Sequence, residues 1–320
     1  MKKILLSAAV VITILSCQND SADSASPTTN AISNRGCASQ EVLEAQMIAD
    51  PTLAIRMNEI EAFTQNTISK SNFRLVNGKI VIPVVVNILY RTAAENISNA
   101  RIQSQIDVLN KDFTATNSDY NTIPALFTGV AANVDITFEL VTINRKITKK
   151  RSWGTTSEVK STSSGGTNPT SPTTTLNFWV CTIGGGILGY AQFPGGPSST
   201  DGVVCDSKYV GITSNTGGAY PYNLGRTATH EVGHWMNLRH IWGDTTCGSD
   251  LVSDTPTHNT ANYGVPTYPH YSTCVGTPIE MTMNYMDYTD DRGMYMFTNG
   301  QKSRISAIFV SGGARAGFGI

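Results

Sequence analysis

The chain of 320 residues, 40% of them hydrophobic, is long enough for one sizeable domain with a buried core, which excludes a wholly disordered protein. Its 23 lysine and arginine residues nearly balance 24 aspartate and glutamate residues, for a formal net charge of -1. This balance gives no overall attraction to nucleic acid or to anionic lipid. We therefore expect no nucleic-acid partner and only local recognition of other molecules.

Residues 1–16 have the pattern of an export signal. Two lysines follow the first methionine, and Ile4–Leu15 is an apolar stretch too short to span a bilayer as a mature helix. The run that ends at Cys17 resembles a lipobox, so we expect Cys17 to carry a lipid that attaches the mature protein to a membrane. Cleavage by an ordinary signal peptidase near Ser16 is the alternative. Both predict export, as an outer-membrane lipoprotein or as a secreted protein.

The next two segments are predicted to precede the catalytic part. Residues 17–35 are rich in Ser, Asn, Thr and Ala and have little to bury, which indicates a flexible tether. Residues 36–74 have helical spacing of apolar side chains, with Pro51 placed where a second helix could begin. We expect a short helical prosegment that is removed by a cut near Lys70 or Arg74.

The remaining chain divides into a predicted N-terminal catalytic subdomain, 75–240, and a C-terminal one, 241–320. The run from Lys79 is β-branched and nearly all apolar, as expected of a central strand covered on both faces. Further strands are predicted from Val134 and from Leu176. The helix between the first two strands has one apolar stripe, formed by Ile102, Ile106, Leu109 and Phe113.

The second subdomain has few regular patterns until its last part. There, Thr298 and Gln301 match a capping box and predict the start of a final helix. The Gly- and Ser-rich stretch 153–175 in the first subdomain lacks periodicity as well, and a surface loop is expected there.

The segment HEVGHWMNLRH, residues 230–240, carries three histidines of ligand type. On a helix, side chains four residues apart lie one above the other, so His230 and His234 can present nitrogens to one zinc ion, with Glu231 beside them. A continuous helix would turn His240 away, so the helix must stop. Asn237 is the expected stop, because asparagine adopts the left-handed conformation more readily than other non-glycine residues. Three protein ligands leave one position open for water, which is typical of a catalytic zinc site.

This motif is similar to the extended zinc motif of the metzincin metallopeptidases and resembles their pappalysin or cytophagalysin (ulilysin-like) branch, although Asn237 stands where most metzincins have glycine. Residues 283–288 resemble the metzincin Met-turn, which implies that Met286 forms an apolar floor beneath the metal. The likeness covers roughly 81–308. It implies an α+β fold with a twisted mixed five-stranded sheet, a backing helix and an active-site helix up to His240. A smaller irregular C-terminal subdomain would follow, with the substrate cleft between the two.

The chemistry implied is hydrolysis of internal peptide bonds in protein or peptide substrates by a zinc endopeptidase. Zinc lowers the pKa of bound water from about 15.7 toward about 7. Glu231 would act as the general base that takes the proton of this water and hands it to the departing amine. Tyr288 follows Met286 by two positions, as a zinc-proximal tyrosine does in several metzincins. Its expected role is to bind the oxyanion or to ligate zinc transiently, and plain packing is the alternative.

Cys37 resembles the prosegment cysteine by which some metzincins stay latent, with its thiolate in the open zinc position. This predicts a zymogen. A free or disulfide-bonded cysteine is the alternative for Cys37. Four other cysteines can pair in three ways, and the resemblance favours Cys247 with Cys274, which leaves Cys181 with Cys205.

The resemblance also implies calcium, with Asp244, Asp250 and Asp254 as hard oxygen ligands in the loop after the zinc motif. Solvated or capping aspartates are the alternative. An acidic specificity pocket near Asp290 or Asp291 is a further hypothesis.

We expect a monomer. Two other functions stay open: a peptidase-fold binding protein without turnover, and a zinc hydrolase of a non-peptide bond.

Overall fold

The computed structural model describes most of the chain: residues 34–70, 80–215 and 218–318. All of them belong to one compact unit over residues 31–320. The predicted export signal, Cys17, most of the predicted tether and Arg74 lie outside the described residues. None of the helices in the described ranges is long and apolar enough to cross a membrane.

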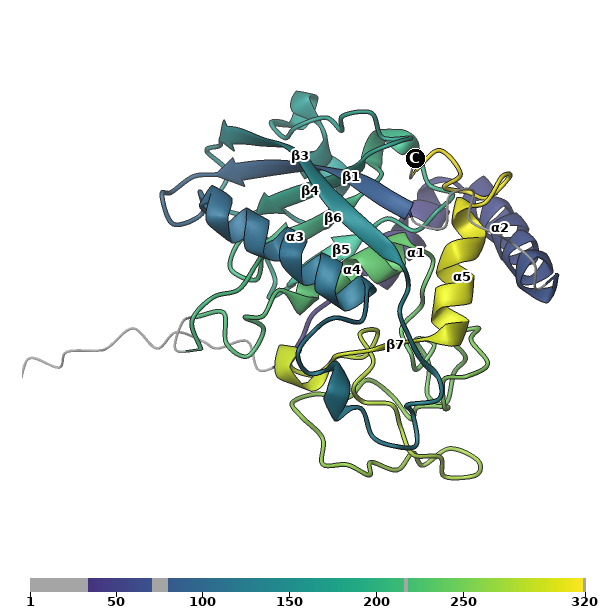
Figure 1. Cartoon of the computed structure of the whole chain (residues 1–320). Coiled ribbons are helices and arrows are strands. Elements are labelled where there is room, and N and C mark those ends of the chain that lie inside the picture. The colour runs from purple at the N-terminus through teal and green to yellow at the C-terminus, as the bar shows by residue number, and fades with distance from the viewer. Residues whose placement is uncertain (1–33, 71–79, 216–217, 319–320) are drawn as a thin grey trace, which may run out of the picture. The chain divides into compact units, whose positions relative to one another are not determined.

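A mixed five-stranded sheet forms the frame of this unit, as predicted (Figure 1). Its strands are β1 (Ile80–Tyr90), β3 (Ile136–Ile147), β4 (Leu176–Cys181), β5 (Gly189–Ala191) and β6 (Val203–Asp206). The strand order is β3-β1-β4-β6-β5, and only the pair β5–β6 is antiparallel. β5 therefore lies at one edge of the sheet. A second, two-stranded sheet joins β2 (Ala131–Ala132) to β7 (Phe297–Thr298).

Two helices cover one face of the large sheet, α3 (Asn99–Phe113) and α4 (Arg226–Trp235). α3 begins at Ser98, whose hydroxyl accepts a hydrogen bond from the Arg101 N–H at 3.2 Å. The predicted stripe of α3 is confirmed, because its four apolar residues are buried in the same core as those of α4. α4 packs against α3 and against strands β5 and β6, which places the histidine segment beside the sheet edge.

Three other helices complete the regular structure: α1 (Ser39–Ala49), α2 (Thr52–Ser69) and α5 (Asn299–Phe309). The first two confirm the helices expected over 36–74, and α2 starts directly after Pro51. α5 begins with the predicted capping box of Thr298 and Gln301. α1 lies against β5, and α2 packs along α5 (Figure 1).

Short 3-10 helices interrupt the loops of the described residues: Tyr120–Thr122, Ser157–Lys160, Thr162–Ser164, Ser198–Thr200 and Asp291–Gly293. Two of them fall in the segment 153–175, which was expected to be a loop without periodicity.

The predicted disulfide between Cys181 and Cys205 is wrong, because both cysteines are buried free thiols. Strands β4 and β6 pair with Val180 opposite Cys205 and with Cys181 opposite Asp206. Since side chains alternate along a strand, the two sulfur atoms point to opposite faces of the sheet. They accordingly belong to separate apolar clusters.

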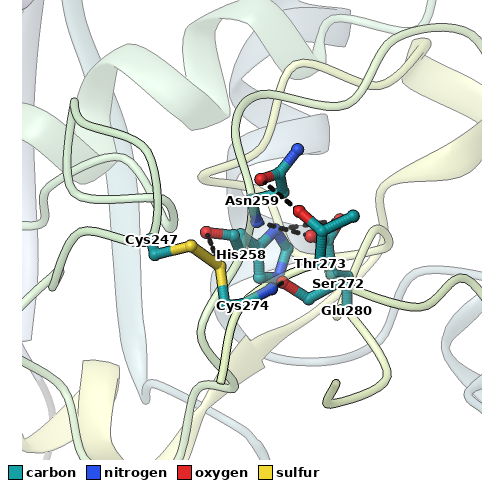
Figure 2. The surroundings of a disulfide bond; sticks show 7 residues. All are labelled: Cys247, His258, Asn259, Ser272, Thr273, Cys274 and Glu280. Carbon is teal, nitrogen blue, oxygen red and sulfur yellow. Dashed lines mark hydrogen bonds and ion pairs between the residues drawn. A yellow bond between two sulfur atoms is a disulfide. The ribbon is translucent and has the colours of Figure 1, made fainter. Parts of the chain in front are cut away.

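The other predicted disulfide, Cys247–Cys274, is present in the irregular C-terminal part (Figure 2). Hydrogen bonds also connect the loops on the two sides of the disulfide. The Cys247 N–H donates to the Asn259 carbonyl at 3.1 Å, and the Thr273 hydroxyl donates to the Asn259 side chain at 2.7 Å. This part has few regular elements, so the covalent link helps to hold its loops together.

Replacing both Cys247 and Cys274 by serine is expected to lower the free energy of unfolding by about 3 to 4 kcal/mol. The two cysteines are separated by 27 residues, and opening a loop of this length returns entropy to the unfolded chain. Urea unfolding of parent and variant measures the change. Reductant should bring the parent to the midpoint of the variant, whereas equal midpoints under oxidising conditions would contradict the prediction.

Candidate active site

The active-site helix α4 is buried along its whole length, and it carries His230 and His234 one turn apart. Their side chains lie on the same side of the helix, as their spacing predicts. Glycine at position 233 is required, because a Cβ there would lie 2.5 Å from the Met286 sulfur. Met286, the expected floor, is fully buried and packs directly against this helix.

The helix stops where the sequence indicated, at Asn237, which has a φ of 73°. The Asn237 N–H donates to the His234 carbonyl and the Leu238 N–H donates to the Gly233 carbonyl, both at 2.9 Å. These two bonds form the Schellman motif that ends helices with a left-handed residue. The reversal brings His240 back toward the helix, with its Nε2 atom 3.1 Å from that of His234.

Alanine at position 237 is expected to cost about 1 kcal/mol of stability, because it lacks the short polar side chain that makes the left-handed conformation tolerable for asparagine. Glycine should stay within about 1 kcal/mol of the parent, since it adopts this φ freely but has a more flexible unfolded state. It would also remove the Asn237 amide nitrogen, which is buried without a hydrogen-bond partner. Urea unfolding of the two variants tests this order, and equal stability of the alanine and glycine variants would contradict it.

The three imidazoles are arranged to bind one cation. Nε2 of His234 lies 3.1 Å from Nε2 of both His230 and His240. The other ring nitrogen of each, Nδ1, faces an oxygen acceptor: the carbonyls of Tyr285 (2.7 Å) and Leu238 (2.8 Å) and the carboxylate of Asp244 (2.5 Å). Because these oxygens only accept, the protons are on the Nδ1 atoms, and three Nε2 lone pairs converge. Such a set repels itself unless a cation lies between them, so it fits zinc.

The protonation states agree with this arrangement. Burial, together with the neighbouring imidazoles, lowers the pKa of His230 and of His234 well below the usual value. Both rings are therefore neutral, which is the form that ligates a metal.

Cys37 completes the group. One ligand atom from each of the three histidines and from Cys37 lies within 4.8 Å of the others, and all four residues are buried. Among the described residues, no other group of three or more Cys, His, Asp or Glu side chains converges in this way. One sulfur and three nitrogens are a ligand set typical of zinc.

Glu231 lies beside the histidines and contacts the segment that follows Cys37. Its Oε2 atom accepts hydrogen bonds from the Ser39 hydroxyl at 2.8 Å and from the Cys37 thiol at 3.3 Å. Burial raises the pKa of Glu231 to about 7. The Ser39 oxygen also accepts from the Ala191 N–H of β5 at 2.8 Å. Sequence reasoning missed Ser39, since a lone serine carries no motif.

Glycine at position 189 makes room for this carboxylate. A Cβ there would lie 2.8 Å from Cγ of Glu231, so only glycine lets the strand β5 approach it.

Tyr288 faces the same cluster. Its ring centroid lies 4.9 Å from that of His240 and 5.6 Å from that of His230. Its hydroxyl donates to the Cys37 carbonyl at 3.2 Å. The Trp242 ring stacks on His240 with centroids 4.3 Å apart and an interplanar angle of 9°, and its centroid lies 4.7 Å from that of Tyr288. Trp242 was not predicted, although its position two residues after the motif placed it close to the site.

Arg35 is buried in a pocket beside the histidines, with only 3% of its surface exposed. Its Nη2 atom donates to Asp291 at 2.5 Å, and its Nη1 atom donates to the Thr227 hydroxyl at 3.2 Å. Nε donates to the Thr289 carbonyl at 3.2 Å, and the guanidinium carbon lies 4.8 Å from the centre of the Tyr222 ring. The pocket thus has an acidic base and an aromatic wall.

Asp291 serves a second purpose at the start of α4. Its Oδ2 atom accepts hydrogen bonds from the N–H groups of Leu224 (2.8 Å) and Arg226 (3.3 Å). The residue at the N-cap position is Gly225, which has no side chain to cap the helix. Of the two acidic residues singled out in the sequence, Asp291 is the one that forms a hydrogen bond with Arg35, whereas the carboxylate of Asp290 pairs with Arg292 at 4.0 Å.

The structure does not support the predicted calcium site. Each of its three aspartates is used locally as a hydrogen-bond acceptor: Asp244 by His240, Asp250 by Thr255 and the Val252 N–H, and Asp254 by Thr298 and the Gly300 N–H. They are part of no converging group of potential metal ligands in the described ranges. Their carboxylates stabilise turns and caps instead.

Similarity to known proteins agrees with this site. The family model of peptidase family M43, described as pregnancy-associated plasma protein-A, matches residues 183–310. An extracellular metalloprotease of Verticillium alfalfae is 32% identical over 244 residues, which cover 72% of this chain and 78% of that protein. An extracellular metalloprotease of Pyricularia oryzae is 31% identical over 275 residues, covering 85% of this chain and 86% of that protein.

Solved structures show the same fold. A promirolysin variant from Tannerella forsythia superposes with a TM-score of 0.80 at 38% identity, covering 88% of this chain and 96% of that chain. Mature mirolysin from the same organism, in complex with a cleaved peptide, gives a TM-score of 0.71 at 41% identity, with 75% and 95% covered. These similarities confirm the resemblance inferred from the zinc motif. The chain belongs to the pappalysin family M43 of the metzincins and is a zinc metalloendopeptidase.

Proposed function

We propose that the chain is the latent precursor of an exported zinc endopeptidase, with His230, His234 and His240 as zinc ligands and Glu231 as the general base. The observation that carries this proposal is the convergence of three Nε2 lone pairs next to the buried Glu231 carboxylate. When bound, zinc supplies a water molecule of lowered pKa and polarises the carbonyl of the scissile bond.

The protein groups around this site have separate tasks. Glu231 accepts a proton from the attacking water and delivers it to the amine that leaves. The Tyr288 hydroxyl, which now donates to the Cys37 carbonyl, becomes free to donate to the substrate oxyanion once residue 37 has left. Because this hydroxyl already holds a carbonyl oxygen, we favour binding of the oxyanion by Tyr288 over plain packing.

A polypeptide is the substrate that the sheet edge favours. The backbone beside Cys37 pairs with β5: the Leu188 N–H donates to the Gly36 carbonyl at 2.7 Å, and the Ala38 N–H donates to the Gly189 carbonyl at 3.1 Å. After this segment leaves, the same edge is free to pair with another extended chain. Main-chain pairing favours a peptidase over a hydrolase of non-peptide bonds, and the intact general base favours turnover over silent binding.

We further propose that the pocket of Arg35 selects an arginine side chain of the substrate. Four groups contact this guanidinium, and the carboxylate of Asp291 lies at the base. An acidic base and an aromatic wall suit a planar cation better than an apolar or acidic side chain.

Latency is proposed to come from residues 35–39, the cleft segment, which contains Cys37. Its sulfur is near the histidines, and the Ser39 hydroxyl bonds to Glu231, so metal and base are blocked together. The match to promirolysin covers 88% of this chain and the match to the mature form 75%, and the difference approximates the length of 36–74. This supports removal of that segment by a cut near Lys70 or Arg74.

Export is supported by the N-terminal signal pattern and by relatives that are named extracellular metalloproteases. We propose a lipid at Cys17 as the membrane attachment, with free secretion after cleavage near Ser16 as the alternative. Labelling of intact cells with a lipid precursor, compared with a Cys17→Ser variant, distinguishes the two.

The experiment that tests the proposed function combines metal analysis with proteolysis. Prosegment-free protein should bind one zinc ion per chain and should cleave casein, and a chelator should abolish both. Tight binding of one zinc ion without cleavage of any peptide would leave the fold intact but overturn the peptidase proposal in favour of the silent or non-peptide alternative.

In the full chain, Cys37→Ala is expected to raise the rate of self-activation at least about tenfold, because the cleft segment loses its metal ligand. Cleavage of a quenched fluorescent peptide over time measures the rate. Cys181→Ala serves as the control, since that thiol is also buried but belongs to a different apolar cluster from Cys37. Unchanged latency of the Cys37→Ala chain would contradict the switch.

A further inference from the structure

Helix α2 makes contacts of its own with the catalytic part. Its Leu53 and Met57 side chains are buried with Phe193, a residue of the loop after β5. The Arg56 guanidinium donates to the Gly195 carbonyl at 2.8 Å. Position 195 favours glycine, because its φ is 102° and a Cβ there would also lie 3.0 Å from an apolar side chain of α2.

An ion pair fastens the same helix to α5. The two oxygens of Glu61 accept from the two terminal nitrogens of Arg304, one of them at 2.9 Å, which is the bidentate geometry of a strong pair. Only 1% of the Arg304 side chain is exposed, against 27% for Glu61. The Nε atom of Arg304 donates to the Asn237 carbonyl at 3.1 Å, so the pair is connected to the end of the zinc-binding segment.

Arg304 depends on α2 for its charge balance. Among the described residues, Glu61 is its one carboxylate partner within ion-pair distance. If α2 left, the guanidinium would lose both terminal hydrogen bonds and retain only a backbone carbonyl. Both hydrogen bonds of this bidentate pair break when α2 leaves, and water has to replace Glu61 at the guanidinium. Release of α2 is therefore opposed by a contact that no residue of the cleft segment makes.

We call this set of partners, Phe193, Gly195 and Arg304, the α2-docking surface. Its contacts do not require the chain to be continuous between α2 and β1. They also hold the cleft segment near the metal site, since α1 begins at Ser39 and leads directly into α2. A docked helix keeps its neighbour at high effective concentration even after the chain is cut elsewhere.

We propose that the α2-docking surface retains the cleaved prosegment, so that dissociation of α2, rather than the cut before β1, is the step that frees the active site. The occupant is residues 52–69 of this same chain. The cut itself is ordinary hydrolysis of one peptide bond, and only non-covalent contacts change afterwards. This inference rests on the proposed latent precursor and extends it to the step that follows cleavage.

The test uses the full chain in a Glu231→Gln background, which prevents self-cleavage and keeps an oxygen for the Ser39 hydroxyl. Brief treatment with trypsin cuts the chain after α2, and intact mass identifies the nicked species. Size-exclusion chromatography at successive times then gives the half-time for loss of the prosegment. The matched variants are Glu61→Gln and Glu59→Gln, which remove one carboxylate each from α2. Glu59 is exposed, and the ion pair with α5 is made by Glu61.

The expected result is co-elution of the nicked prosegment with the catalytic part, and release at least about tenfold faster for Glu61→Gln but not for Glu59→Gln. Immediate release from the parent, or equal half-times for the two variants, would overturn the proposal. Should Glu61→Gln fail to fold, Arg56→Gln removes the Gly195 contact and must also shorten the half-time. The half-time for loss of the prosegment is measured without zinc analysis or an activity assay. A failure of the proposed peptidase function and a failure of this proposal can therefore be told apart.

Discussion

Glu231→Gln is expected to lower kcat of the prosegment-free enzyme roughly 10²- to 10⁴-fold while the zinc content stays at that of the parent. The amide has nearly the same shape as the carboxylate but cannot accept the proton of the attacking water. Glu231 also lies among the residues around the metal without being one of the convergent ligands, so binding of zinc should not depend on it. Peptide cleavage and metal analysis on the same sample measure both quantities.

Glu139→Gln is the control for this change, because that carboxylate lies on the exposed side of β3 and is remote from the cluster. It should leave kcat unchanged. A Glu231→Gln enzyme that keeps more than about a tenth of the parental kcat would exclude Glu231 as the general base.

Asp291→Asn is expected to reduce kcat/KM on the order of 10²-fold for peptides with arginine at the selected position, because a buried charge pair is lost. Peptides with an uncharged residue there should be cleaved as before or slightly better. Asparagine keeps one oxygen for the N–H groups at the start of α4, so the helix cap is preserved. A library of peptides that vary at one position on each side of the cleaved bond gives kcat/KM for the arginine peptides and for the uncharged ones.

Asp290→Asn is the matched control, since this neighbouring carboxylate pairs with Arg292 and the hydrogen bond of Arg35 goes to Asp291 instead. An equal fall for arginine and uncharged peptides in the Asp291→Asn enzyme would indicate a damaged helix rather than a changed pocket. That outcome would refute selection of arginine by Asp291.

Local patterns in the sequence predicted the elements that local forces decide. The β1 strand and the apolar stripe of α3 follow from side-chain periodicity, and the capping box at Thr298 follows from two residues three positions apart. The stop at Asn237 was predictable because a backbone reversal was needed to bring His240 to the metal. These inferences depend on residues close together in the chain, for which the geometry of a helix, strand or cap fixes the relative positions of the side chains.

Contacts between distant segments were not predictable in the same way. Arg35 and Asp291 are 256 residues apart, and nothing in either neighbourhood indicates the other. The wrong Cys181–Cys205 pairing has a related cause, because the register of β4 against β6 decides which face each sulfur occupies. The predicted calcium ligands find no support in the structure, because an aspartate in a loop serves equally well as a cap and sequence spacing does not distinguish the two uses.

The double use of Asp291 limits how the selectivity of this enzyme could change over evolution. One carboxylate oxygen is fixed by the N–H groups that open α4, so the other is already in place for a guanidinium and little ordering is lost on binding. Replacement of Asp291 by a side chain that cannot accept these hydrogen bonds would therefore also uncap the helix that carries two zinc ligands, so a change at this position has to keep an acceptor, as asparagine does. Position 225 offers no substitute cap, because its φ is 81° and a Cβ would lie 3.1 Å from the Gln105 side chain. New preferences are more accessible through the wall of the pocket, at Tyr222 or Thr227, than through its base.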